Sequence, residues 1–131
     1  MKPIVTEVLD YLKTQRVGVF AVEMLDGSPH GSTLHFAHKD DPLQFFFETG
    51  TDCLKSEVLL KNGSTRASFV VGSDENNMKT LQLDGTARIP STNEEEFFMD
   101  TYLSKFPSKE PKVKDPEAVF YIIHSHLVAF H

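Results

Sequence analysis

Turn signals divide this 131-residue chain into short segments, and this division restricts its fold more than any other feature. The clearest is Asp26-Gly27-Ser28-Pro29, because an Asp-Gly pair readily adopts the positive φ angles of a tight hairpin turn. It separates two segments rich in β-branched and aromatic residues, at 17–25 and 31–38. Polar turns at 39–42 and 73–77 separate later segments of the same kind. The pattern predicts strands joined by hairpins, which favours an antiparallel sheet over a parallel one.

Six strands and three helices are expected along the chain. The strands cover residues 17–25, 31–38, a segment from Phe45, 65–72, 78–89 (with Gly85 at a bulge or bend) and 118–130. The helices cover residues 3–15, the segment after Gly50, and a segment that a capping box of Thr92 and Glu95 opens and that ends near Phe106. Residues 107–116 are expected to form a loop. The order predicts a mainly β, α+β domain: a small six-stranded antiparallel barrel, closed or partly open, with flanking helices.

Composition indicates one soluble globular domain over residues 1–131, with 40% hydrophobic and 24% charged residues. The net charge of −6 argues against nucleic acid or an anionic membrane as the main partner, since both require clustered lysine and arginine. Cys53 is the single cysteine, which excludes an internal disulfide and fits a reducing compartment. The start of the chain does not resemble a signal peptide, and no apolar run approaches the ~20 residues of a membrane span. A cytoplasmic location is therefore expected.

Residues 45–61 combine a strand, a tight turn and a short helix, and they contain the first candidate site. Gly50 permits the turn, and apolar residues then recur at helical spacing. A helix N-terminus with free N–H groups is a place where phosphate binds well. Here the hydroxyls of Thr49 and Thr51 flank it, and Lys55 follows one turn later. The pattern fits a phosphate site, and it also fits an ordinary capped helix with a solvated lysine.

The six histidines and Cys53 are further candidates for a metal site or a reactive group. His124 and His126 lie two apart on a strand and are expected to share a face, whereas a zinc site needs three or four converging ligands. We therefore expect rim histidines and no metal. Cys53 at a helix N-terminus is either a reactive thiol or a small residue packed under the turn.

Four stretches, in this order and spacing, resemble the FMN-binding split β-barrel family typified by pyridoxamine 5′-phosphate oxidase, including its general stress protein-like branch. They are Gly18-Val19-Phe20-Ala21, Pro29-His30-Gly31-Ser32-Thr33-Leu34, residues 47–55 and Leu83-Asp84-Gly85-Thr86-Ala87. The resemblance covers about residues 4–130. It implies a Greek-key split barrel that binds FMN at the interface of a homodimer.

The resemblance also implies roles for individual residues. Lys55 corresponds to a phosphate-binding lysine, and Thr49 to a backbone or hydroxyl contact. The second strand, at Ser32, Thr33 and Leu34, is expected to run along the ribityl chain and ring of FMN. Thr80 and Gln82, on the fifth strand, are expected to make polar contacts with the flavin that is bound by the other subunit. The full set of expected cofactor-binding residues is Ser32, Thr33, Leu34, Phe47, Thr49, Lys55, Thr80 and Gln82.

The chain departs from the oxidase at three of its cofactor contacts. Ser32 and Ala37 stand where the oxidase has basic residues, and Leu54 stands where it has an arginine. Each lost charge-assisted contact to a phosphate costs roughly 1.5–3 kcal/mol. The resemblance implies a flavin-dependent oxidoreductase acting on an unassigned small molecule, with no catalytic side chain assigned. The alternatives are a non-catalytic flavin- or haem-binding, sensory module, and a dimeric structural domain without a ligand.

Overall fold

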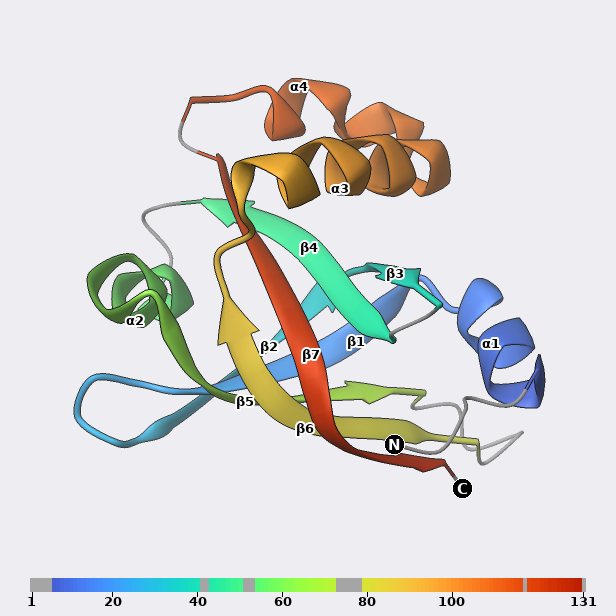
Figure 1. Ribbon diagram of the computed structural model, residues 1–131, viewed down its shortest axis with the longest axis horizontal. Helices are drawn as coiled ribbons and strands as arrows, with labels where there is room; N and C mark the ends of the chain where they lie inside the picture. Colours follow the sequence, from blue (N-terminus) through green and yellow to red (C-terminus); the bar gives the residue numbers. More distant parts are fainter. Residues whose placement is uncertain (1–5, 41–42, 51–53, 73–78, 117, 131) are drawn as a thin grey trace.

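The computed structural model describes residues 6–40, 43–50, 54–72, 79–116 and 118–130 (Figure 1). Within these residues seven strands form one antiparallel sheet in the order β2-β1-β5-β6-β7-β4-β3. The strands are β1 (Val17–Glu23), β2 (Pro29–His35), β3 (Ala37–Lys39), β4 (Gln44–Gly50), β5 (Ser64–Val71), β6 (Leu81–Arg88) and β7 (Ala118–Phe130). The helices are α1 (Thr6–Lys13), α2 (Leu54–Asn62), α3 (Thr92–Lys105) and α4 (Glu110–Val113), with a 3₁₀ turn η1 (Pro107–Lys109).

The sheet curls into a half-barrel, which confirms the expected antiparallel α+β fold with flanking helices (Figure 1). The expected strand at 31–38 is two strands, because the chain turns at Phe36 from one edge of the sheet to the other. The Phe36 ring is fully buried, and its backbone N–H donates to the carbonyl oxygen of Arg16 at 3.1 Å. This break raises the number of strands from six to seven.

The concave side of the sheet holds the main core, which is rich in phenylalanine. The rings of Phe20 and Phe47 lie 4.5 Å apart between centroids, and those of Phe45 and Phe69 lie 5.0 Å apart. Helices α1 and α2 lie at opposite ends of the half-barrel in Figure 1 and add buried residues to this core. They contribute Val8, Tyr11, Leu12, Val58 and Leu59.

A second, smaller core lies where α3 packs over β3 and β4 (Figure 1). Phe46 points to this side of β4 and meets Phe98 of α3 with ring centroids 3.9 Å apart. Because Phe45 and Phe47 face the other core, β4 is buried on both sides. The three consecutive aromatic residues therefore fit a strand that lies between two layers.

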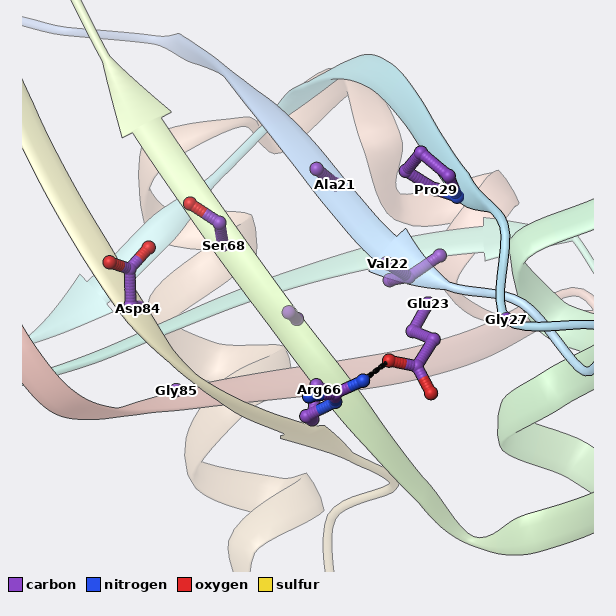
Figure 2. Close-up of a pocket in the computed structure, with 10 residues that line it drawn as sticks. Ala21, Val22, Glu23, Gly27, Pro29, Arg66, Ser68, Asp84 and Gly85 are labelled. Atoms are coloured by element: carbon purple, nitrogen blue, oxygen red, sulfur yellow. Dashed lines mark hydrogen bonds and ion pairs between the residues drawn. The ribbon is translucent and has the colours of Figure 1, made fainter.

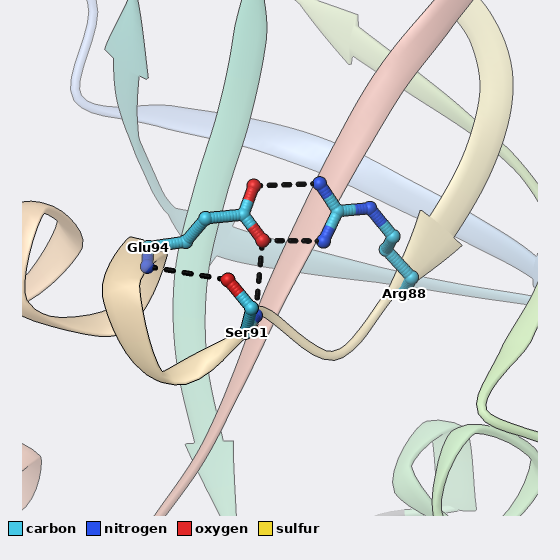
Figure 3. Close-up of polar contacts among 3 residues, drawn as sticks. All are labelled: Arg88, Ser91 and Glu94. Atoms are coloured by element: carbon cyan, nitrogen blue, oxygen red, sulfur yellow. Dashed lines mark hydrogen bonds and ion pairs between the residues drawn. The ribbon is translucent and has the colours of Figure 1, made fainter.

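Two details of the sequence prediction need correction. The capping box of α3 is formed by Ser91 and Glu94, one residue before the predicted Thr92 and Glu95 (Figure 3). Ser91 fits because its backbone is extended, whereas Thr92 already belongs to the helix. The predicted loop at 107–116 contains η1 and α4, since Val113 is buried against α3.

The predicted irregularity at Gly85 is confirmed. The register between β6 and β7 shifts between Asp84 and Gly85, which pair with Leu127 and Ser125. The extra residue lies on β7, at His126. A bulge of this kind bends the strands and helps the sheet to curl.

Candidate functional site

The convex side of β2, β1, β5 and β6 is the part of the sheet that no described helix covers (Figure 1). We call it the outer face. Residues on β1 alternate strictly, with Phe20 and Val22 buried while Val17 and Val19 are 42% and 43% exposed. An exposed pair of valines on an open sheet is a candidate surface for a ligand or a partner.

One row of side chains crosses the outer face from β2 to β6. Thr33 pairs with Val19, Val19 pairs with Val70, and Val70 pairs with Gln82. Strand neighbours lie about 4.8 Å apart, so the row spans about 14 Å. It has a polar residue at each end and two valines between them, which makes a flat apolar strip between two hydrogen-bonding groups.

In the next row, Ala21, Ser68 and Asp84 line a pocket of about 470 Å³ (Figure 2). Gly31, Ala21, Ser68 and Asp84 pair in turn across the same four strands. At one end of the pocket the guanidinium of Arg66 forms an ion pair with Glu23. The pocket is open and shallow because several of its lining residues, such as Ala21, Gly27 and Ser68, have a short side chain or none.

The polar groups of the outer face are partly paired with each other. The Gln82 side-chain amide donates to the Asp84 carboxylate at 3.1 Å. With the Arg66–Glu23 pair, the four side chains supply two negative charges and one positive charge. The described part of this face therefore suits an uncharged or cationic group better than a bare phosphate.

The structure divides the predicted cofactor residues between the two sides of the sheet. Thr33 and Gln82 are exposed on the outer face, and Thr80 is half-buried just before β6. Ser32, Leu34 and Phe47 belong to the concave side, as their pairing and burial indicate. Thr49, on β4, is 7% exposed. Their predicted contacts to a cofactor stay predictions.

Two of the inward residues have identifiable positions. Phe47 is 1% exposed and packs between Phe20 and Tyr121 in the main core. The Ser32 hydroxyl is enclosed, with no hydrogen-bond partner among the described residues. An unsatisfied buried hydroxyl is costly, so Ser32 is the one position on β2 where the local structure invites a further polar contact.

Lys55 is the second residue of α2, the element that follows β4 in the chain. Its side chain lies outside what the structure describes, and so do Thr51 and Cys53. The phosphate contact of Lys55 therefore stays a prediction, and so do both interpretations of Cys53, as a reactive thiol or as a small packed residue.

The described histidines belong to no cluster of metal ligands. Among the residues that the structure describes, no group of three possible metal ligands comes together. His38 donates from Nε2 to Asp40 at 3.0 Å, yet burial keeps the pKa of its imidazole below the ordinary value. The pKa of His35 is lowered as well, first by burial and then by nearby cations.

Sequence reasoning missed Val19, Val70, Ser68 and Asp84 as members of this surface. Their side of each strand became visible only through the pairing of four strands that are far apart in sequence. On β1 both sides are apolar, because Val17, Val19 and Ala21 alternate with Phe20 and Val22. The alternation of polar and apolar residues therefore gave no signal on β1.

In the described part of the chain, no helix is both long and apolar enough to cross a membrane.

Comparison with known protein families assigns the chain to one of them. The sequence model of pyridoxamine 5′-phosphate oxidase matches residues 4–126, nearly the whole chain. The chain belongs to the pyridoxamine 5′-phosphate oxidase family. No curated protein matches it.

Solved structures share the fold of this family member. A haem-binding protein from Mycobacterium smegmatis has a TM-score of 0.80 at 15% identity, over 100% of this chain and 55% of that one. A putative pyridoxamine 5′-phosphate oxidase from Listeria innocua has a TM-score of 0.72 at 20% identity, over 95% and 94%. General stress protein 26 from Bacillus anthracis has a TM-score of 0.69 at 17% identity, over 95% and 90%. The chain thus spans little more than half the length of the Mycobacterium protein.

The residues of the outer face fit the ring of a flavin better than its phosphate. A flat ring needs an apolar floor with hydrogen-bonding groups at its rim, and the row from Thr33 to Gln82 has that composition. A phosphate needs cations or free N–H groups, and Arg66 on this face is already paired with Glu23. The described residues of the outer face therefore supply groups that suit a flat ring and none that is free to neutralise a phosphate.

Proposed function

We propose that this protein binds FMN on its outer face, at the interface of a homodimer, and is a flavin-dependent oxidoreductase of unassigned substrate. The observation that carries the proposal is the row of Thr33, Val19, Val70 and Gln82, which no described helix covers. Family membership supports it, since the family is one in which flavin binding is common.

Each residue of the proposed site has one physical task. Val19 and Val70 support the flat ring by van der Waals contact, while Thr33 and Gln82 offer hydrogen bonds at its ends. Lys55 neutralises the phosphate at the start of α2. When bound, the flavin supplies the electron-transfer chemistry, and the chain supplies binding, orientation and exclusion of water.

A second copy of the chain is part of the proposal because the bound ring and the valines would otherwise expose apolar surface to water. Val17 and Val19 together expose apolar surface that a flat ring alone does not remove from water. A second copy placed on the same face satisfies a twofold interface, in which equal patches meet. Burying this surface stabilises the dimer by about 25 cal/mol per Å² of apolar area.

Haem binding without turnover is the second candidate. The observation in its favour is the haem-binding protein from Mycobacterium smegmatis, which shares the fold over the whole of this chain. A haem ring is also flat and apolar, so the same strip of valines suits it. The outer face alone does not separate the two ligands.

Turnover separates the oxidoreductase from the binding module. The purified protein is loaded with FMN, desalted, and mixed with reduced nicotinamide nucleotides in air, while their absorbance is followed. Continuous consumption above the rate of free FMN supports the oxidoreductase. A protein that holds FMN and consumes no donor is a binding module, and a Soret band after incubation with haemin supports the haem candidate.

A further inference from the structure

A pocket of about 280 Å³ lies beside the first turns of α3, at the opposite end of the strand order from the outer face. Its sheet side is formed by the last pair of β3 and β4, Lys39 and Gln44. Side chains two residues apart on a strand share a face. This pair therefore points to the same side as Ala37 and Phe46, which pack in the second core. None of the described residues that line this pocket belongs to the proposed flavin surface.

The other wall of the pocket comes from α3 and contains two aromatic rings, those of Phe97 and Phe98. Phe98 is 2% exposed and fixed against Phe46, whereas Phe97 is 47% exposed although its side chain is large and apolar. The centroids of the two α3 rings lie 6.2 Å apart. An exposed ring in the wall of a pocket offers a surface against which a flat apolar group can pack.

Three polar side chains of the pocket have unused bonding capacity. Among the residues that the structure describes, the carboxamides of Gln44 and Asn93 form no hydrogen bond, and the Lys39 ammonium forms no ion pair. The ammonium lies 5.9 Å from the ring centroid of Phe97, so the free charge and the exposed ring are close together. One small ligand can therefore contact both.

Glu94 also lines the pocket, but its charge is already balanced. Its carboxylate accepts two hydrogen bonds from the guanidinium of Arg88 and one from the backbone N–H of Ser91 (Figure 3). Lys39 therefore gives the described walls of the pocket an excess of one positive charge. This excess suits a monoanion such as a carboxylate better than a doubly charged phosphate, which a single cation does not neutralise.

We propose that this pocket binds a small aromatic carboxylate with one ring. The ring packs against Phe97, and the carboxylate pairs with the Lys39 ammonium. The carboxamides of Gln44 and Asn93 donate hydrogen bonds to the carboxylate oxygens. The volume of about 280 Å³ lies just below the usual range of about 300–1,000 Å³ for ligand pockets, which favours a ligand with a single ring.

Benzoate is the probe that tests the proposal, in an NMR titration of isotope-labelled protein. The side-chain amide groups of Gln44 and Asn93 give signals of their own, and these should shift with benzoate until the site is saturated. Benzamide has the same ring without the charge, and acetate has the same charge without the ring. Each should bind at least about tenfold more weakly, because each loses one of the two main contacts. Signals that do not move with benzoate, or equal affinity for benzoate and either control, overturn the proposal.

Two variants separate the charge from the ring, with folding checked by circular dichroism. Lys39→Gln should weaken benzoate binding by at least about fivefold and leave benzamide binding unchanged, since only the carboxylate needs the cation. Phe97→Leu keeps an apolar side chain at an exposed position and should weaken both ring probes. Lys61→Gln, the same change at the exposed far end of α2, is the control and should bind benzoate as wild type does. Wild-type affinity for benzoate in either folded pocket variant contradicts the proposal, as does an equal loss in Lys61→Gln.

Discussion

Arg88, the last residue of β6, donates two hydrogen bonds of 2.7 Å to the two carboxylate oxygens of Glu94 (Figure 3). The same carboxylate accepts the backbone N–H of Ser91 at 2.9 Å, so one side chain joins the sheet to the cap of α3. The arginine is the main reason that the pKa of Glu94 is lowered to about 2. This contact fixes how α3 leaves the sheet and reaches the second core.

Glu94→Gln should destabilise the fold at pH 7. The expected loss in the free energy of unfolding is about 1–2 kcal/mol, reduced by screening because both side chains are about a third exposed. A carboxylate whose pKa is lowered by folding stabilises the protein above its unfolded pKa near 4.5, and this contribution is lost as pH falls toward 2. Urea denaturation at several pH values measures it. A difference between wild type and variant that does not shrink below pH 4 contradicts this assignment.

Gly18→Ala should destabilise the main core. A Cβ at Gly18 would lie 2.2 Å from a ring carbon of Phe69 and 2.9 Å from the carbonyl oxygen of Val70. Phe69 is fully buried among other rings and cannot move aside, so the expected cost is about 1–3 kcal/mol. Gly31→Ala is the control, because a Cβ there meets nothing nearer than 4.0 Å. Equal melting temperatures for the two variants would disprove the packing argument.

Val19→Asp should separate the proposed dimer without unfolding the subunit. Val19 is 43% exposed, so a charge is tolerated in the monomer but not in an apolar interface. Leu60→Asp is the matched control, since Leu60 is 52% exposed and belongs to α2, not to a strand of the outer face. Sedimentation equilibrium checks both. A wild-type monomer, or a Val19→Asp dimer as tight as wild type, removes the second copy from this face.

Lys55→Ala should weaken FMN binding by at least about tenfold, because a charge-assisted contact to phosphate contributes roughly 1.5–3 kcal/mol. Lys61→Ala changes the same charge at the exposed far end of α2 and should leave the affinity unchanged. Quenching of flavin fluorescence gives both dissociation constants. Equal affinities for the two variants exclude Lys55 from the phosphate site.

Local patterns were enough to predict most elements of this fold. Period-two apolar segments and Gly or Pro turns gave the strands, and β7 (Ala118–Phe130) and the bulge beside Gly85 appear where expected. The error at the start of α3 arose because two neighbouring residues carry the same sequence signal. Ser91 and Thr92 both fit an N-cap followed three residues later by Glu, and only the backbone angles of Ser91 decide between them.

The site was less accessible to sequence reasoning than the fold. The resemblance directed attention to Thr33 and Gln82, and the structure places both in one row of the outer face. It treated the second strand as a continuous contact surface, although Ser32 and Thr33 necessarily point to opposite sides. Arg16 and Lys105 both lie over the Phe106 ring, although they are far apart in the sequence, so no spacing in the sequence indicated that they meet.

The visible absorption spectrum after FMN loading tests the central claim most directly. Wild type and Val70→Glu are incubated with excess FMN and desalted, with folding of both checked by circular dichroism. A charge in the middle of the row should displace the ring and leave the core intact, because Val70 points outward between Val19 and Gln82. The account predicts a retained flavin spectrum for wild type and at least about tenfold less flavin for the variant. A colourless wild type, or equal retention by both proteins, would contradict a flavin site on the outer face.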